Sequence, residues 1–264
     1  MRIVVCVKQV LDPEIPARDF QVDRQTKEAI QGLAAMVVNP YDENAIEVAL
    51  QLKGNQKDRT VSALTLGAEP CEKALRHVLA MGCDEAIWLK DACWKELDSF
   101  GIAKVLAKGI RQMGNIDLVL CGRQAGDWDM GQVGPLIAGE LSLPCVPLVY
   151  QINLEQDRLV LKREMDRGVE ILEGRMPLLA TITSASSNQP RYPTVKGLVL
   201  AGRKKIPIWS NQDLQITERI DRLVTVEDLI IPQYERQVRI IDGETGAEKA
   251  TSLAKLLVEM KLLT

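Results

Sequence analysis

The chain has few side chains that carry chemistry on their own. It contains one histidine, His77, and its six cysteines stand singly, without a Cys-x-x-Cys pair. Zinc and iron–sulfur sites need clustered Cys and His ligands, and a Ser–His or Cys–His catalytic arrangement needs a histidine beside its nucleophile. The sequence therefore argues against these sites, so any redox centre must be a bound organic cofactor. We expect the cysteines to be buried free thiols.

Aromatic residues and excess charge are also scarce. Aromatics make up 4% of the 264 residues, so aliphatic side chains must fill the core. The formal net charge is −3, whereas nucleic-acid binding normally needs a concentrated basic face. The N-terminal apolar run, residues 3–7, is too short for a signal peptide or a membrane span. We expect a cytoplasmic protein that binds no nucleic acid and inserts into no membrane.

The sequence does have an alternation of strand and helix patterns. Continuous apolar runs predict strands buried on both faces, and apolar residues at helical spacing predict helices between them. Alternation at this spacing favours a doubly wound, mostly parallel α/β sheet of the adenine-nucleotide-binding type. The predicted strands are residues 3–10, 61–66, 85–89, 117–121 and 178–183, and the predicted helices carry the apolar residues of 45–52, 74–79, 102–110 and 133–141.

The pattern changes after Pro144. Residues 146–153, 158–164 and 168–172 alternate between polar and apolar side chains, which predicts antiparallel edge strands. From residue 184 the chain has isolated apolar anchors and closes with an apolar-faced helix around Leu253 and Met260. We expect a nucleotide-binding domain over 1–183 and an extended C-terminal arm over 184–264. Such an arm lies across a partner or back over the domain, and a small, weakly patterned subdomain is the alternative.

Candidate binding residues lie where strands lead into helices. In an open parallel sheet, ligands bind at the carboxyl ends of the strands. Asn39-Pro40-Tyr41-Asp42 is a compact helix-start signal that follows the first predicted strand. The segment Gly122–Val133 follows a buried strand and contains three glycines, so its backbone N–H groups can close on an anion at the start of the next helix.

Glycine spacing alone leaves two alternatives open at this segment, a phosphate site and a tight connection needed for packing. The segment matches neither the Walker pattern nor G-x-G-x-x-G. Asp127 and Asp129 oppose a bare phosphate and fit ribose hydroxyls, a helix cap or solvent instead. Trp128 fits either stacking on a ligand ring or packing on its own chain.

Several motifs, in the same order over the full length, resemble the beta (small) subunit of electron transfer flavoproteins. The segment Pro190–Val195 and the basic run after it match as well. The resemblance implies a heterodimer with an alpha subunit that carries the electron-exchanging FAD. It also implies an adenine nucleotide in this subunit, AMP in ordinary members and a second FAD in electron-bifurcating ones. The matching motifs are Val7-Lys8-Gln9-Val10, Asn39-Pro40-Tyr41-Asp42, Gly122-Arg123-Gln124-Ala125 with Gln132-Val133-Gly134, and Arg163-Glu164-Met165-Asp166 with Gly168, Glu170 and Pro177.

Carried over by position, the resemblance implies two groups of site residues, and it has the C-terminal arm embrace the alpha subunit. In the partner-docking loop, Val195 would be the apolar anchor that inserts into a dehydrogenase. The nucleotide pocket would comprise Cys6, Asn39, Pro40, Tyr41, Asp42, Leu66, Gly122, Arg123, Gln124, Ala125, Gly126, Asp127, Trp128, Asp129, Met130, Gly131, Gln132 and Val133. The docking loop would comprise Pro190, Arg191, Tyr192, Pro193, Thr194, Val195, Lys196 and Gly197.

The function that the resemblance implies is electron carriage between acyl-CoA or related dehydrogenases and an acceptor, with no bond chemistry in this subunit. The chain departs from the family at Gly126, where a branched apolar residue is common, and at Asp127–Gly131, where bifurcating members have Asp-Gly-Asp-Thr-Ala. The balance of motifs favours AMP slightly, and the alternative is a second FAD with oxidation of NADH. An alternative of another class is a stand-alone ATP- or AMP-binding regulator of the stress-protein type.

Overall fold

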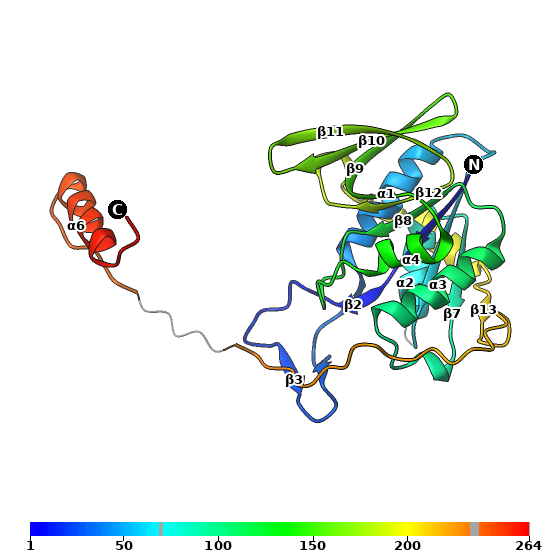
Figure 1. Cartoon of the computed structure of the whole chain (residues 1–264), viewed down its shortest axis with the longest axis horizontal. Helices are drawn as coiled ribbons and strands as arrows, with labels where there is room; N and C mark the ends of the chain where they lie inside the picture. Colours follow the sequence, from blue (N-terminus) through cyan, green and yellow to red (C-terminus); the bar gives the residue numbers. More distant parts are fainter. Residues whose placement is uncertain (69–70, 233–237, 264) are drawn as a thin grey trace. The chain divides into compact units, whose positions relative to one another are not determined.

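The structure of the protein is a computed structural model that describes residues 1–68, 71–232 and 238–263. Its centre is a nine-stranded sheet with the order β11-β10-β9-β12-β8-β1-β6-β7-β13 (Figure 1). The strands of this sheet are β1 (Arg2–Cys6), β6 (Thr60–Leu66), β7 (Glu85–Leu89), β8 (Leu118–Gly122), β9 (Cys145–Glu155), β10 (Arg158–Met165), β11 (Gly168–Arg175), β12 (Leu178–Ile182) and β13 (Ile208–Trp209). The helices are α1 (Pro40–Lys53), α2 (Cys71–Met81), α3 (Ser99–Met113), α4 (Val133–Leu141), α5 (Val195–Arg203) and α6 (Gly246–Glu259), with short 3-10 turns at Ala92–Trp94 and Ser186–Asn188.

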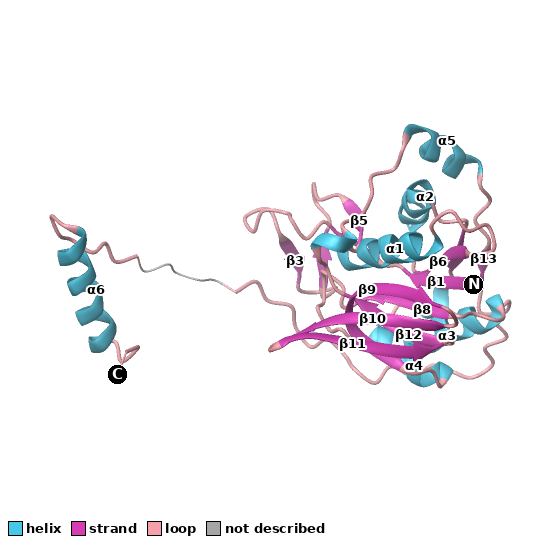
Figure 2. Ribbon diagram, turned by 90° about the horizontal axis from the view of Figure 1, so that it is seen from above, coloured by secondary structure: helices cyan, strands magenta, loops and turns pink. Residues whose placement is uncertain are grey.

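Helices cover both faces of the sheet, as expected for a doubly wound fold (Figure 2). Side chains of β1 alternate between the faces, so Ile3 and Val5 join the core under α1 and α2, while Val4 and Cys6 join the core under α3 and α4. From β9 through β12 to β13 the neighbouring strands are parallel. The predicted α/β class and its mostly parallel sheet are confirmed.

The antiparallel edge is confirmed as well. β10 pairs antiparallel with both β9 and β11, so the last three strands on this side form a meander beside the parallel strands. The segment between β1 and α1 is partly paired. It contains β2 (Gln9–Leu11), which pairs with β5 (Met36–Val38), and a hairpin of β3 (Gln21–Asp23) with β4 (Glu28–Ile30).

The prediction of one strand over residues 3–10 is wrong. β1 ends at Cys6, and the amide of Val7 makes the last ladder bond, to the carbonyl of Leu64 at 2.8 Å. The next amide, that of Lys8, donates to the carboxylate of Asp42 instead, so the chain leaves the large sheet there. The apolar pattern could not show this break, because it continues into β2, which pairs with β5 and not with the large sheet.

Two compact units make up the chain, Met1–Leu229 and Ile230–Thr264, and residues 233–237 and 264 of the second lie outside the described residues. The first unit includes α5 and β13, and Ala201, Leu214 and Ile216 from this region are buried. The predicted boundary at residue 183 separates a nucleotide-binding domain from an arm that is expected to wrap a partner subunit. It stays a prediction, since a single chain does not test it.

Candidate functional site

The predicted pocket segments meet where the sheet changes its direction of winding. β1 and β8 are neighbours, yet the connection after β1 leads to α1 on one face and the connection after β8 leads to α4 on the other. Such a switch point opens a crevice at the carboxyl ends of the two strands, which is where open α/β sheets bind ligands. The predicted residues of 39–42 and 122–133 both lie at this edge.

The side chain of Asn39 holds the two segments together. Asn39 precedes α1 but makes no capping bond to the helix. Its amide nitrogen donates to the carbonyl of Gln124 at 2.9 Å, and its side-chain oxygen accepts the amide of Gly126 at 3.0 Å. This pair of bonds fixes the first half of the loop that follows β8, and Asn39 itself is buried.

Asp42, in the first turn of α1, makes a second connection of this kind. Its carboxylate accepts the amide of Lys8 at 2.8 Å and the amide of Gly122 at 2.9 Å. The space is so tight that a Cβ at Gly122 would overlap Asp42 Oδ1 and lie 2.8 Å from the Cβ of Tyr41. Glycine at position 122 is therefore required by the close approach of α1.

The carboxylates of Asp127 and Asp129, whose role the sequence left open, both bond to donors of this chain. Lys8 Nζ lies 2.8 Å from Oδ1 and 2.6 Å from Oδ2 of Asp127, so this charge is largely compensated. Asp129 accepts a hydrogen bond from Nε2 of Gln124. Neither carboxylate caps α4, whose N-cap residue Gln132 also makes no side-chain bond to the helix. The positive end of the α4 dipole is thus left for another anion.

These features fit an anionic ligand at the start of α4. The helix start is uncapped, the adjacent carboxylates are paired with donors, and Gly131 has a φ of +62° that places its backbone in the left-handed region. Arg123 lies over the Tyr41 ring at 5.1 Å, which fixes one wall of the crevice. Trp128 and Met130 are about half exposed at its rim and are free to contact a ligand.

The remaining pocket residues are spread around this edge. Leu66 ends β6, beside β1, and Ala125 and Val133 are partly buried within and after the loop, whereas Pro40 is exposed. Cys6 is buried and faces Cys121 on the neighbouring strand. A hydrogen bond with Cys6 that holds the protonated form, together with burial, raises the pKa of the Cys121 thiol well above its usual value. Cys121 is therefore a neutral thiol that is not prepared for nucleophilic chemistry.

The predicted docking residues do not join this crevice. Thr194 caps α5 by accepting the amide of Gly197 at 3.0 Å, so Val195 begins a helix. The structure exposes 80% of Val195 and 93% of Tyr192. Leu198, Val199 and Leu200 are exposed on the same helix, and together these five residues form an apolar surface that we call the α5 patch. Pro190, Arg191, Pro193 and Lys196 complete the predicted segment.

Sequence reasoning missed the residues that hold this segment. Arg191 turns inward to Glu47 of α1, and Asn44 Nδ2 donates to the carbonyl of Asn188 at 3.0 Å. Asn188 is fully buried and bonds the carbonyls of Tyr150 and Thr183. The available signal was the polar stripe Asn44, Glu47 and Gln51 along α1, since polar residues at helical spacing need partners when buried.

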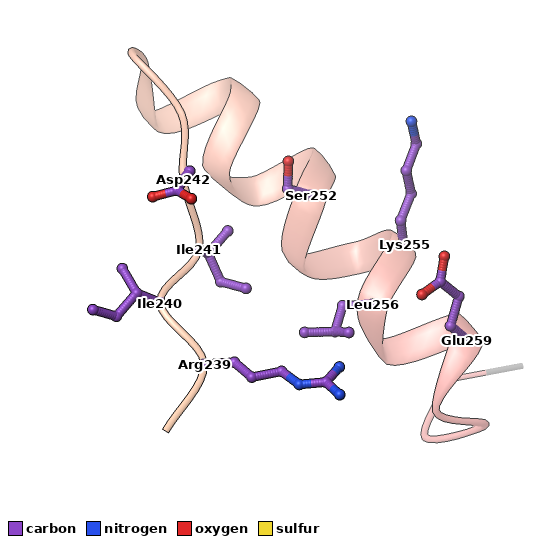
Figure 3. Close-up of a pocket in the computed structure, with 8 residues that line it drawn as sticks. All are labelled: Arg239, Ile240, Ile241, Asp242, Ser252, Lys255, Leu256 and Glu259. Carbon is purple, nitrogen blue, oxygen red and sulfur yellow. The ribbon is translucent and has the colours of Figure 1, made fainter. Parts of the chain in front are cut away.

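The second unit carries an open pocket of its own. Residues 239–242 run alongside α6, and the pocket between them is shown in Figure 3. Ile241 and Leu256 give it an apolar floor, and Arg239, Asp242, Lys255 and Glu259 give it charges of both signs. It includes none of the predicted nucleotide residues. Across the described ranges of both units, no helix is long and apolar enough to cross a membrane.

The fold thus defines a doubly wound α/β protein whose predicted site residues lie at the topological switch point. Comparison with known proteins takes this further. The family model of the electron transfer flavoprotein domain matches residues 31–214. The chain belongs to the electron transfer flavoprotein family, whose members transfer electrons in association with a flavin.

The similar proteins match along the length of the chain. The chain is 34% identical to the caffeyl-CoA reductase-Etf complex subunit CarD of Acetobacterium woodii, over 100% of both chains. It is 37% identical to the electron transfer flavoprotein subunit beta of Thermoanaerobacterium thermosaccharolyticum, over 82% of this chain and 81% of that one. It is 33% identical to the human subunit beta, over 97% and 99%. The resemblance to beta subunits is confirmed.

Proposed function

We propose that this chain pairs with an alpha subunit and holds AMP at the edge between β1 and β8, while the alpha subunit carries the FAD that exchanges electrons. The observation that carries the nucleotide assignment is the uncapped start of α4, placed beside carboxylates that are already paired with donors. The residues of this chain would bind and orient the phosphate and ribose. They perform no bond chemistry.

A nucleotide held this way stabilises the fold. Ligand that binds only the folded state adds about 2.7 kcal/mol when its concentration is a hundred times the dissociation constant. The crevice joins loops from β1, α1 and β8, so its occupant would tie together three segments that are distant in the sequence. A structural role for AMP follows from this position.

The α5 patch and α6 are the proposed contact surfaces. The α5 patch presents Val195 and its apolar neighbours without a covering element in the described part of the chain, which suits docking to an acyl-CoA or related dehydrogenase. Helix α6 buries none of its residues within the chain and exposes Leu253, Val258 and Met260 along its length or just beyond its end. This face suits the alpha subunit.

A second candidate function is electron bifurcation, with FAD in place of AMP. Its support is the match over the whole of both chains to CarD, which is named as a subunit of a reductase–Etf complex. FAD in this position would supply two-electron oxidation of a nicotinamide cofactor. The protein would then be an oxidoreductase component as well as a carrier.

The deciding experiment is to co-express the chain with its alpha subunit and to measure flavin and AMP per heterodimer. One flavin with one AMP supports the main proposal, and two flavins without AMP support the second. A stable single chain with bound ATP would favour the stand-alone regulator and overturn both. A cytoplasmic location is also part of the proposal, because all six cysteines are free thiols, as in a reducing compartment.

A further inference from the structure

Asp42 is buried beside the ends of β1 and β8, and its carboxylate is hydrogen-bonded to the backbone of both. It is 6% exposed, and its two carboxylate oxygens each accept a backbone amide, Oδ2 from Lys8 at 2.8 Å and Oδ1 from Gly122 at 2.9 Å. Its own amide donates to the carbonyl of Asn39 at 2.9 Å within the first turn of α1. One side chain therefore joins the ends of β1, α1 and β8.

The two amides that Asp42 accepts lie where the strands leave the sheet. Lys8 N is the first amide after the β1 ladder ends, and Gly122 N belongs to the last residue of β8. A buried amide without an acceptor costs free energy, so both chain exits depend on this carboxylate.

Asn39, three residues before Asp42, bonds to the same loop. Its bonds to Gln124 and Gly126 fix the stretch just after Gly122. We call the side chains of Asn39 and Asp42 the α1 clamp. Together the two side chains bond residues 122, 124 and 126, at the end of β8 and in the loop that follows it. Of the two, only the Asp42 side chain also bonds the exit of β1.

We propose that Asp42 is a positioning residue that sets the distance between the β1 and β8 exits and so shapes the loop that receives the nucleotide phosphate. The expectation that Asp42 belongs to the nucleotide pocket stays a prediction. This inference rests on the proposed function, because it concerns the geometry of that same crevice. The affinity for nucleotide should therefore depend on Asp42 even though its carboxylate lies beneath the binding surface.

A matched control exists at the opposite end of the same two strands. Asp117 precedes β8, and its Oδ2 accepts the amide of Arg2, the first residue of β1, at 2.8 Å. It thus makes the same type of aspartate-to-amide bond between the same strands, but at the edge away from the crevice. Asp117→Asn makes the same change from carboxylate to amide without touching the α1 clamp.

The test compares the full chain, wild type and variant, for its dissociation constants with AMP and with FAD by calorimetry. Asp42→Asn keeps the volume but can accept only one of the two amides, so we expect its affinity for the bound nucleotide to fall about tenfold or more. Asp117→Asn should stay within about twofold of wild type. In parallel, amide hydrogen exchange should accelerate at Lys8 and Gly122 in Asp42→Asn and not in Asp117→Asn.

The outcomes separate the inference from the proposed function. A wild-type chain that binds neither AMP nor FAD overturns the proposed function, and the inference with it. A wild-type chain that binds nucleotide, combined with an Asp42→Asn variant of equal affinity, overturns the inference alone. Equal loss of affinity in both variants also overturns it, because the effect would then reflect general stability. If Asp42→Asn does not fold, Asp42→Glu, which keeps both acceptors on a longer stem, serves for the same comparison.

Discussion

Arg191 and Glu47 form a bidentate ion pair that fastens the proposed docking segment to α1. Nε of Arg191 lies 2.7 Å from Oε2, its second nitrogen lies 2.9 Å from Oε1, and its backbone amide donates to the same carboxylate at 3.2 Å. The Glu47 side chain is 7% exposed and that of Arg191 is 46% exposed. Such a pair fixes geometry in two directions. The position of the α5 patch therefore depends on a helix whose other end holds the nucleotide loops.

The first prediction is that Glu47→Gln destabilises the chain by about 1–3 kcal/mol, because Arg191 loses its charged partner in a partly buried place. The loss is measured as the free energy of unfolding in urea. Glu173→Gln is the control, since Glu173 pairs with Arg158 at 3.1 Å and both side chains are at least half exposed. The control should cost less than about 1 kcal/mol. Equal losses would contradict the structural role of Glu47.

The second prediction concerns pH and Asp42. Burial raises the pKa of Asp42 to about 7, although the amides of Lys8 and Gly122, the Asn39 side chain and the Lys8 charge all act to lower it. Between pH about 4 and about 7, Asp42 keeps its proton in the folded state but loses it in the unfolded chain. The free energy of unfolding therefore falls as pH rises through this range. The full change corresponds to about 4 kcal/mol. We expect the stability advantage of wild type over Asp42→Asn to shrink across this range, measured by urea unfolding.

Glu47 should change the stability with pH in the opposite direction from Asp42. Burial alone would raise its pKa, but the hydrogen bonds and charge of Arg191, with a hydrogen bond from Gln51, hold the pKa below its usual value. Its stabilising effect is therefore present above the unfolded pKa and is lost as pH falls through the lower folded value. The advantage of wild type over Glu47→Gln should grow with pH. A parallel trend for the two variants would contradict one of the two assignments, and its direction would show which.

The third prediction addresses docking. Val195→Asp places a charge in the α5 patch, so we expect electron delivery to the dehydrogenase to fall at least tenfold while the heterodimer and its nucleotide stay intact. Steady-state reduction of the partner and size-exclusion chromatography give the two measurements. Ile208→Asp is the control, because Ile208 is also exposed but lies on β13 outside the patch. Loss of the heterodimer in Val195→Asp would contradict the proposal that the α5 patch docks to the dehydrogenase.

The fourth prediction addresses the anion site. Gly131→Glu puts a carboxylate beside the start of α4, and we expect the purified heterodimer to lose its nucleotide. The substitution also strains a left-handed backbone, at a cost of about 1 kcal/mol. Gly32→Glu controls for that strain, since Gly32 has a φ of +51° and lies outside the crevice. Nucleotide retained in Gly131→Glu would show that the phosphate lies elsewhere.

Much of the fold was predictable because it follows from local patterns. β6, β7 and β8 are short apolar runs between helices with one buried face, and the meander of β9 to β11 was visible as alternation. The break after Cys6 and the helix at Val195 were not predicted. In both places the deciding interaction is a side-chain oxygen that accepts a backbone amide, from Asp42 and from Thr194, and apolar periodicity does not register such bonds.

The sequence by itself determined the α/β class, the order of its elements and the two segments at the strand ends, because hydrophobic periodicity and glycine placement act over a few residues. Only the tertiary structure decided how those segments work together. Asp42 and Gly122 are 80 residues apart, and Glu47 and Arg191 are 144 apart. Hydrogen bonds at such separations arise only after the sheet has assembled, so a pattern of neighbours cannot reveal them. That is why the bonds from the Asp42 carboxylate to the amides of Lys8 and Gly122 were not predicted.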